Sequence, residues 1–220
     1  MTELHEGERG RAARFECRHG FAREDDHEIK LPGGVLLREP GFRVRAAVLD
    51  HGIPCLAFAL EESRHISVRK EALAALGLRT GRWLKGLKLA VLDEAPDDTL
   101  IPLEDGQSMP LGRLREAIID QEPGRKLAYV VDARFTPENQ ARIIELARGA
   151  DELYIESAFS AADAEQAARK LHLTGEQAAW LARQAGAKRL IPVHCSPRYK
   201  DKPGDPVAEA LRAFAGTLAS

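Results

Sequence analysis

The sequence has no long apolar run. None of its 220 residues lies in an uninterrupted stretch of about 18 apolar residues, which is the length that a membrane-spanning helix needs. The first thirty residues are rich in charge, whereas a secretion signal has an apolar segment behind a basic start. We therefore expect a protein that neither crosses a membrane nor carries a secretion signal.

Cysteine is scarce. The three cysteines form an odd set without a Cys-x-x-Cys pair, which argues against a disulfide framework and against a zinc site built from thiolates. We expect reduced thiols and a cytoplasmic location.

An excess of basic charge is also missing. The formal net charge is -2, from 32 basic and 34 acidic residues, so a globally basic nucleic-acid binder is excluded, whereas a local basic patch is not. With 44% hydrophobic and 30% charged residues, the composition is that of a globular chain with one sizeable core.

The second half of the chain alternates strand signals with helix signals. The predicted strands are 127–131, 152–156 and 189–193. The predicted helices are 137–150, 161–171, 174–186 and 205–216. Thr136 and Thr174 are the expected N-caps of two of these helices. Such alternation predicts an α/β fold.

The first half gives weaker signals. Residues 42–50 alternate apolar and polar side chains, which predicts a half-buried strand, and 56–60 predict a second one. Residues 63–124 have helical and proline-rich stretches that indicate an insertion or arm. Residues 1–40 hold too few apolar positions for a core element.

Five potential metal-binding or proton-transfer residues stand at the ends of predicted elements. They are His51, Asp132, Glu156, His172 and His194. In α/β folds, sites gather at the carboxyl ends of strands, and carboxylates with imidazoles can share a metal ion. Singly, such an Asp is more often a turn or cap residue, and such a His is more often a surface or core residue. Their joint placement predicts a metal site.

Four stretches of the chain combine these residues with a longer pattern. They read FRVRAAVLDHGIPCLAFALE (42–61), KLAYVVDAR (126–134), ELYIESAF (152–159) and LHLTGEQAAWLARQAGAKRLIPVHCSPRY (171–199). Together they resemble the C-terminal part of the ribonuclease Z family in the metallo-β-lactamase superfamily. The resemblance implies the C-terminal half to two-thirds of a metallo-β-lactamase-like αββα sandwich. Residues 1–220 would form one partial domain with an arm-like insertion at about 63–124, in which 69–88 would correspond to the start of the arm with which the family grips tRNA.

The resemblance also implies a site with two zinc ions, with Mn²⁺ as an alternative metal. By position, His51 would bind the first ion, Asp132 would bridge both ions and His194 would bind the second. Two bridged ions lower the pKa of a bound water and hold the phosphate of an RNA phosphodiester. The implied reaction is endonucleolytic cleavage at the 3′ side of precursor tRNA, by a homodimer whose arm reaches across to the substrate.

Further residues match by position. His172 matches the histidine of the family's His-Ser-Thr stretch, and Glu156 matches the glutamate of its His-Glu-Ala-Thr stretch. The resemblance implies that this pair donates the proton to the leaving 3′ oxygen. Ser196 and Arg198 match positions near the bound phosphate.

One family motif is missing. The sequence has no His-x-His-x-Asp-His, and its remaining histidines, at 5, 19, 27 and 65, lack that spacing. Each ion would keep only two ligands, whereas a catalytic zinc usually has about three protein ligands. We therefore expect a piece of a longer protein that is weak or inactive alone. The arm stretch RTGRWL (79–84) also lacks the family's Gly-Pro.

Two other functions stay open. One is a hydrolase of the same fold that acts on a small phosphodiester or ester. The other is a non-catalytic half-fold module, which metal content would separate from an enzyme. Basic residues interleaved with Trp83 favour RNA over a small substrate. They are Arg64, Arg69, Lys70, Arg79, Arg82, Lys85 and Lys88.

Overall fold

The protein is described by a computed structural model that covers residues 1–5, 8–39, 41–104, 106–200 and 204–216. The chain divides into two compact units. The first consists of Met1–Glu61 and Arg125–Ser220, and the second is Glu62–Gly124. No helix in the described part of the chain is both long and apolar enough to cross a membrane.

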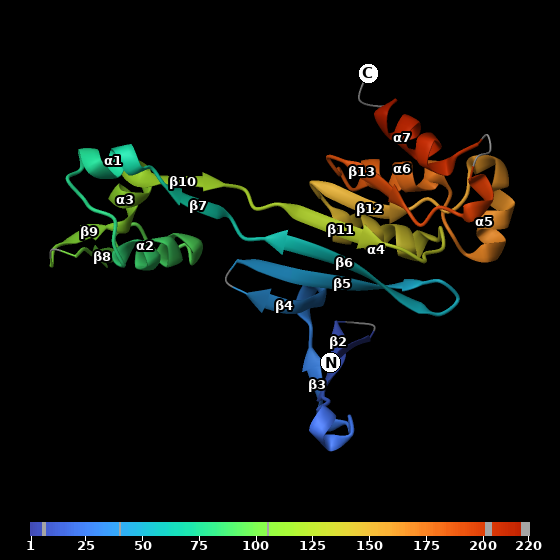
Figure 1. Ribbon diagram of the computed structural model, residues 1–220, viewed down its shortest axis with the longest axis horizontal. Coiled ribbons are helices and arrows are strands. Elements are labelled where there is room, and N and C mark those ends of the chain that lie inside the picture. The colour runs from blue at the N-terminus through green and yellow to red at the C-terminus, as the bar shows by residue number, and fades with distance from the viewer. Residues whose placement is uncertain (6–7, 40, 105, 201–203, 217–220) are drawn as a thin grey trace. The chain divides into compact units, whose positions relative to one another are not determined.

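A six-stranded sheet forms the centre of the first unit, in the order β13-β12-β11-β6-β5-β4 (Figure 1). The strands are β4 (Val35–Glu39), β5 (Phe42–Asp50), β6 (Pro54–Glu62), β11 (Lys126–Val130), β12 (Glu152–Glu156) and β13 (Leu190–Val193). Strands β11, β12 and β13 are parallel, and β6 pairs antiparallel with β11. The five strands predicted from residue 42 onward are confirmed, with small differences at their ends.

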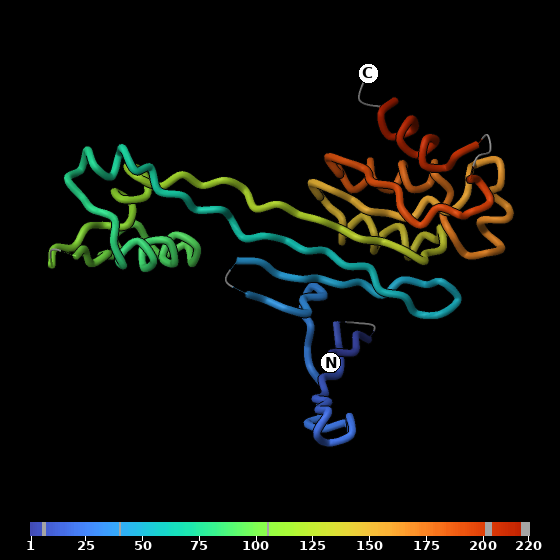
Figure 2. Tube along the Cα trace, in the orientation of Figure 1, coloured from blue at the N-terminus to red at the C-terminus, as the bar shows by residue number. Residues whose placement is uncertain are grey.

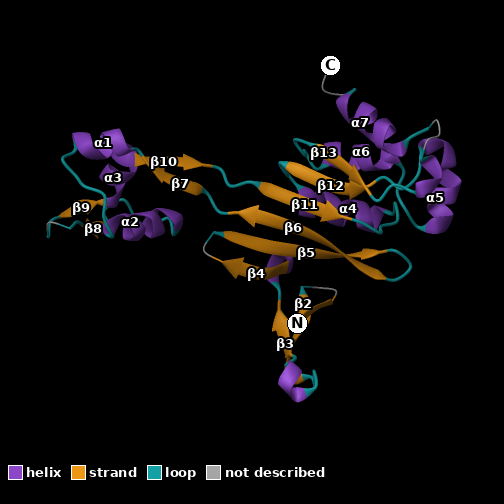
Figure 3. Cartoon of the chain, viewed as in Figure 1, coloured by secondary structure: helices purple, strands orange, loops and turns teal. Residues whose placement is uncertain are grey.

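Helices separate the strands of the second half (Figure 3). They are α4 (Pro137–Ala147), α5 (Ala164–Lys170), α6 (Gly175–Gln184) and α7 (Pro206–Ala215), with short 3-10 turns at Ala161–Asp163 and Pro197–Tyr199. Both N-cap predictions are confirmed. The Thr136 side chain accepts a hydrogen bond from the backbone N–H of Asn139, and Thr174 forms a capping box with Gln177.

One face of the sheet builds the main core. Val130, Leu153 and Ile155 are fully buried there against residues of α4 and α6, such as Ile143 and Leu181. Burial of this apolar surface is the main force that joins helices to sheet. The predicted α/β class is confirmed.

The opposite face of the sheet carries exposed apolar side chains. Leu56, Phe58 and Tyr129 are 37%, 36% and 46% exposed, and they belong to none of the core clusters of the described residues. The sheet is mixed, and its parallel part is of the kind that is usually covered on both faces. A sheet with helices on one face is one half of the layers in an αββα sandwich.

The N-terminal residues form strands that the sequence did not predict. Strands β1 (Thr2–His5), β2 (Arg9–Arg14) and β3 (Glu24–Lys30) make a three-stranded antiparallel sheet, with 3-10 turns at Cys17–His19 and Pro32–Gly34. The prediction of no core element over 1–40 is therefore wrong, because these three strands and β4 of the central sheet lie within that range. Charged pairs across the strands, such as Arg11 and Asp26 at 2.8 Å, replace the apolar alternation on which that prediction relied.

The second unit has a core of its own, and Figure 2 traces its chain from teal to yellow-green. Its elements are β7 (His65–Val68), α1 (Lys70–Ala75), α2 (Trp83–Leu92), β8 (Leu100–Pro102), β9 (Ser108–Pro110), α3 (Leu111–Ile118) and β10 (Ile119–Glu122). Trp83 is 8% exposed and donates from Nε1 to the Arg79 carbonyl. Its expected place on an RNA-contacting surface is therefore wrong, because it packs inside this unit.

Candidate metal centre

Five polar side chains converge at the carboxyl edge of the parallel strands. His51 follows β5, Asp132 follows β11, Glu156 ends β12, His172 follows α5, and His194 follows β13. Because β11, β12 and β13 run in the same direction, their carboxyl ends meet at one edge of the sheet. The first unit thus brings together all five residues that the sequence singled out there.

The side chains around Asp132 lie close enough to share a metal ion. Nδ1 of His194 is 3.2 Å from Oδ1 of Asp132, and Nδ1 of His172 is 4.0 Å from the same oxygen. The rings of His51 and His172 are 4.7 Å apart. Two groups of three have ligand atoms within 4.8 Å of one another: His51, Asp132 and His172, and Glu156, His172 and His194.

His172 and Glu156 form a hydrogen-bonded pair. Nδ1 of His172 lies 2.7 Å from Oε2 of Glu156, whose side chain is 0% exposed. Oε1 of Glu156 accepts from the Ala133 backbone N–H at 2.6 Å. Burial raises the pKa of Glu156 to about 7, although the Ala133 bond opposes this. Burial also lowers the pKa of His172, and His51 acts in the same direction.

Glu156 gives the metal-free chain a characteristic pH dependence. The pKa of Glu156 is about 7 in the folded chain and near the usual 4.5 in an unfolded chain, so the folded chain binds this proton more tightly. The free energy of unfolding is therefore expected to fall as the pH rises from about 4.5 to about 7. The Glu156→Gln variant cannot titrate and should lack this decrease.

Urea unfolding of the chain and of Glu156→Gln, in chelator and over that pH range, measures the difference. The lowered pKa of His172 stabilises the fold at higher pH, but it acts in both proteins and largely cancels in the comparison. If the free energy of unfolding changed with pH in the same way in both proteins, the pKa of Glu156 would not be raised.

Three residues at the site have backbone conformations that side chains rarely adopt. The φ angles of Asp132, Leu171 and His194 are 56°, 67° and 53°. Asp and His tolerate this region, but a leucine there is an outlier. The Leu171 carbonyl accepts a hydrogen bond from Nδ1 of His51 at 2.9 Å. The strained turn at Leu171 therefore places a carbonyl on His51 and places His172 beside it.

The sequence did not single out Leu171 or Asn139. Asn139 is 1% exposed, and its side-chain amide bonds the N–H of Asp50 at 2.9 Å, the carbonyl of Asp50 at 2.8 Å and the carbonyl of Arg134 at 3.0 Å. It ties Asp50, the last residue of β5, to the loop after Asp132. An asparagine in the first turn of a helix is usually exposed, so no sequence signal marked it.

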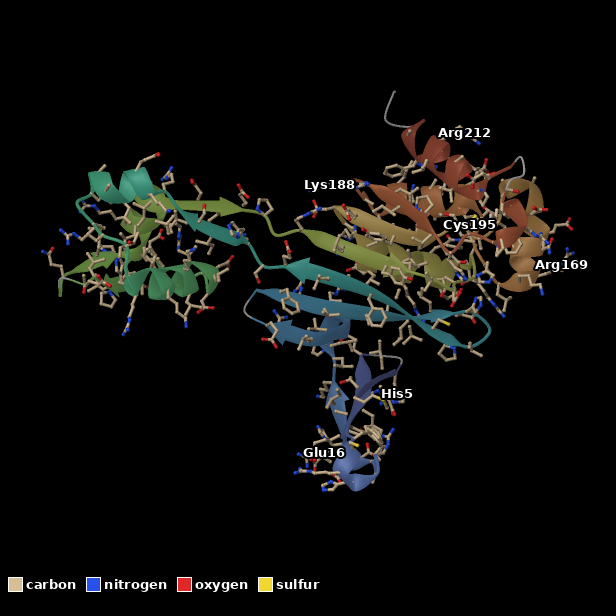
Figure 4. The ribbon with its side chains drawn as sticks, viewed as in Figure 1. His5, Glu16, Arg169, Lys188, Cys195 and Arg212 are labelled. Carbon is tan, nitrogen blue, oxygen red and sulfur yellow. The ribbon has the colours of Figure 1, made fainter. Side chains whose placement is uncertain are left out.

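The two predicted phosphate-contacting residues lie just beyond His194, near Cys195, which Figure 4 labels. The Ser196 backbone N–H donates to the Ala158 carbonyl at 3.1 Å. Arg198 donates to Oε1 of Gln166 at 2.5 Å, and its guanidinium lies 5.4 Å from the centre of the Phe159 ring. These contacts are to other protein groups, so the roles of Ser196 and Arg198 stay predictions.

The donor set suits a borderline metal such as Zn²⁺, which takes imidazole and carboxylate ligands. Two ligands of one tetrahedral zinc, each at about 2.0–2.1 Å, lie about 3.3 Å apart, and the 3.2 Å between His194 and Asp132 matches this spacing. The two groups of three share His172. The described residues therefore fit one three-ligand ion but not two at the same time.

Solved structures resemble the chain at low sequence identity. Human tRNase Z, short form, is 20% identical, with a TM-score of 0.42 over 76% of this chain and 41% of that protein. A metallo-β-lactamase fold protein from Bacillus subtilis is 16% identical, with a TM-score of 0.43 over 85% of this chain and 47% of that protein. A scan against protein-family profiles gives no match.

Curated relatives named ribonuclease Z match most of the chain. The protein from Deinococcus radiodurans is 34% identical over 201 residues, which are 91% of this chain and 58% of that protein. The protein from Geobacillus kaustophilus is 37% identical over 194 residues, 86% of this chain and 57% of that protein. The chain thus spans a little over half the length of the curated relatives that it matches. By sequence, it is homologous to the ribonuclease Z family over most of its own length.

Proposed function

We propose that this protein takes part in metal-dependent hydrolysis of RNA phosphodiesters, with precursor tRNA cut at its 3′ side. The observation that carries the proposal is the cluster of His51, Asp132, His172 and His194 at one edge of the sheet, in a chain related to ribonuclease Z. We further propose that the metal is zinc, with Mn²⁺ as an alternative, and that the protein is a cytoplasmic homodimer.

The site residues would divide the work between metal binding and proton transfer. Asp132 would bridge two ions, with His51 on one side and His194 on the other. A bound metal pair would lower the pKa of the attacking water and would stabilise the negative charge of the phosphate. His172 lies beside the buried Glu156, which would orient its imidazole toward the leaving oxygen.

The second unit supports RNA as the substrate. Arg79, Arg82 and Lys85 are exposed on and before α2, where they could contact phosphates. Arg64 and Arg69 are less available, because they lie near Glu94 and Asp120 at 3.6 Å each. A substrate without a long phosphate backbone would not use such a surface.

Ligand number limits the activity of this chain alone. The chain is expected to bind zinc weakly and to cleave precursor tRNA poorly or not at all. When it is joined to an upstream segment with a His-x-His-x-Asp-His motif, the longer protein is expected to bind zinc and to cleave precursor tRNA, because each ion gains two ligands. Single-turnover cleavage of precursor tRNA and metal content would be measured on both proteins.

The outcomes separate the competing functions. Robust cleavage by the 220-residue chain with stoichiometric zinc would show that other residues complete the site. Hydrolysis of bis(p-nitrophenyl) phosphate without tRNA cleavage, in the longer protein, would favour a small-substrate hydrolase. Neither activity and no bound metal would favour a non-catalytic module.

A further inference from the structure

The histidines near Asp132 have the hydrogen-bond pattern of metal ligands. A histidine that binds a metal usually donates its other ring N–H to a carboxylate or a backbone carbonyl. Nδ1 of His51 is engaged by the Leu171 carbonyl at 2.9 Å, and Nδ1 of His172 is engaged by Glu156 at 2.7 Å. In both residues Nε2 is therefore the nitrogen that is left for a metal.

The same contacts set Glu156 apart from the ligands. Glu156 is fully buried and accepts from both the His172 ring and the Ala133 N–H. Its 2.7 Å separation from Nδ1 of His172 is a hydrogen-bond distance and is shorter than the roughly 3.3 Å between two ligands of one tetrahedral zinc. Glu156 thus fits a residue that orients His172 better than it fits a ligand.

We propose that this chain by itself binds a single divalent ion, held by Nε2 of His51, a carboxylate oxygen of Asp132 and Nε2 of His172. Each of these three residues has a potential ligand atom within 4.8 Å of those of the other two, and three protein ligands with one open position are typical of a mononuclear zinc site. A second ion would find only Asp132 and His194, which is too few ligands. The proposal uses the metal site of the proposed function but not its RNA substrate.

In this chain, His172 would then bind the metal ion and would not donate a proton. An imidazole whose Nε2 binds a metal and whose Nδ1 bonds Glu156 has no nitrogen left for a leaving group. In a protein with a full ligand set, His172 would be released from the metal and could donate a proton. The single-ion state is thus a physical reason for weak cleavage by the chain alone.

Metal binding without RNA tests this assignment. The metal-free chain is titrated with Co²⁺, whose visible absorption reports ligand geometry and, at saturation, the number of ions bound. One equivalent per chain is expected. His51→Ala, Asp132→Asn and His172→Ala should each weaken binding by more than about 100-fold, whereas Glu156→Gln should weaken it by about 10–100-fold, as expected for a residue that orients a ligand.

A histidine outside the site provides the matched control. His65→Ala, in β7 of the second unit, should leave metal binding unchanged. Thermal unfolding of every metal-free variant separates loss of a ligand from loss of the fold. His172→Gln gives a second variant at the central position.

Four results would contradict or change the assignment of a single ion to His51, Asp132 and His172, or the proposed function. Two equivalents bound by the chain, or one equivalent retained by folded His172→Ala, would overturn the assignment. Loss of binding in His194→Ala and Glu156→Gln, with binding retained in His51→Ala, would place the ion in the other group of three. Failure of tRNA cleavage in the longer protein would contradict the proposed function but would leave this result unchanged.

Discussion

Asp132→Ala is expected to abolish both metal pairing and RNA cleavage in a protein that carries this chain and the full ligand set. Asp132 has His194 at 3.2 Å and His172 at 4.0 Å from the same carboxylate oxygen, so it is the group that two ions could share. Without a shared carboxylate, the two ions that would hold the attacking water and the phosphate would not be kept together. Metal content and single-turnover cleavage would be measured together.

The conformation of Asp132 calls for a second variant. Its φ of 56° strains an alanine, whereas asparagine tolerates this region. Asp132→Asn therefore removes the charge with little change in backbone energy. If Asp132→Asn keeps two ions and full cleavage, Asp132 is not the bridge.

His172→Ala should behave differently in the same longer protein. It is expected to retain both ions and to slow the chemical step by something on the order of 10²–10⁴, which is the usual contribution of a general acid. In the 220-residue chain, the same substitution should remove the single ion. This contrast links the two proposed states of His172.

The sequence predicted the edge of the sheet better than it predicted the site within it. Strands end where their apolar runs end, so Asp132, Glu156 and His194 could be placed at strand ends from periodicity alone. Parallel pairing then brings those ends together. The distances among the side chains depend on loop conformations, and periodicity does not encode them.

Two contacts could not be predicted from the periodicity of apolar residues in the sequence. The Leu171 carbonyl reaches His51 across 120 positions of sequence, because Leu171 ends α5 with a positive φ. A leucine gives no sign of such a conformation, since glycine or asparagine is the usual residue there. The N-terminal strands were missed for a related reason. Their ion pairs, such as Arg11 with Asp26, connect residues that look like a solvated loop in sequence.

Helix α3 was hidden by prolines. Pro110 stands directly before Leu111, the first residue of the helix, and the surrounding residues are polar. Leu114 and Ile118 are nevertheless fully buried in the core of the second unit. Proline next to a helix start is well tolerated, so its presence marks a boundary as readily as a loop.

Asn139→Ala is expected to lower the free energy of unfolding by about 3 kcal/mol, because it leaves three backbone groups of Asp50 and Arg134 without their side-chain partner. Those groups lie at the end of β5, directly before His51, and in the loop after Asp132. Metal affinity of the chain should therefore fall together with stability. Urea unfolding of the metal-free protein and Co²⁺ titration measure the two effects.

Two further variants locate the cause of that loss. Asn139→Asp keeps an oxygen that can accept from the Asp50 N–H but cannot donate to the carbonyls of Asp50 and Arg134, so it should also be destabilising. Glu138→Ala changes an exposed neighbour in the same helical turn and should stay within about 0.5 kcal/mol of the parent protein. If Asn139→Ala were no more destabilising than Glu138→Ala, the turn at His51 would be held by other contacts. If Asn139→Ala lost stability but kept full metal affinity, His51 would keep its position without this amide, and the carbonyl of the strained Leu171 would be sufficient to orient its ring.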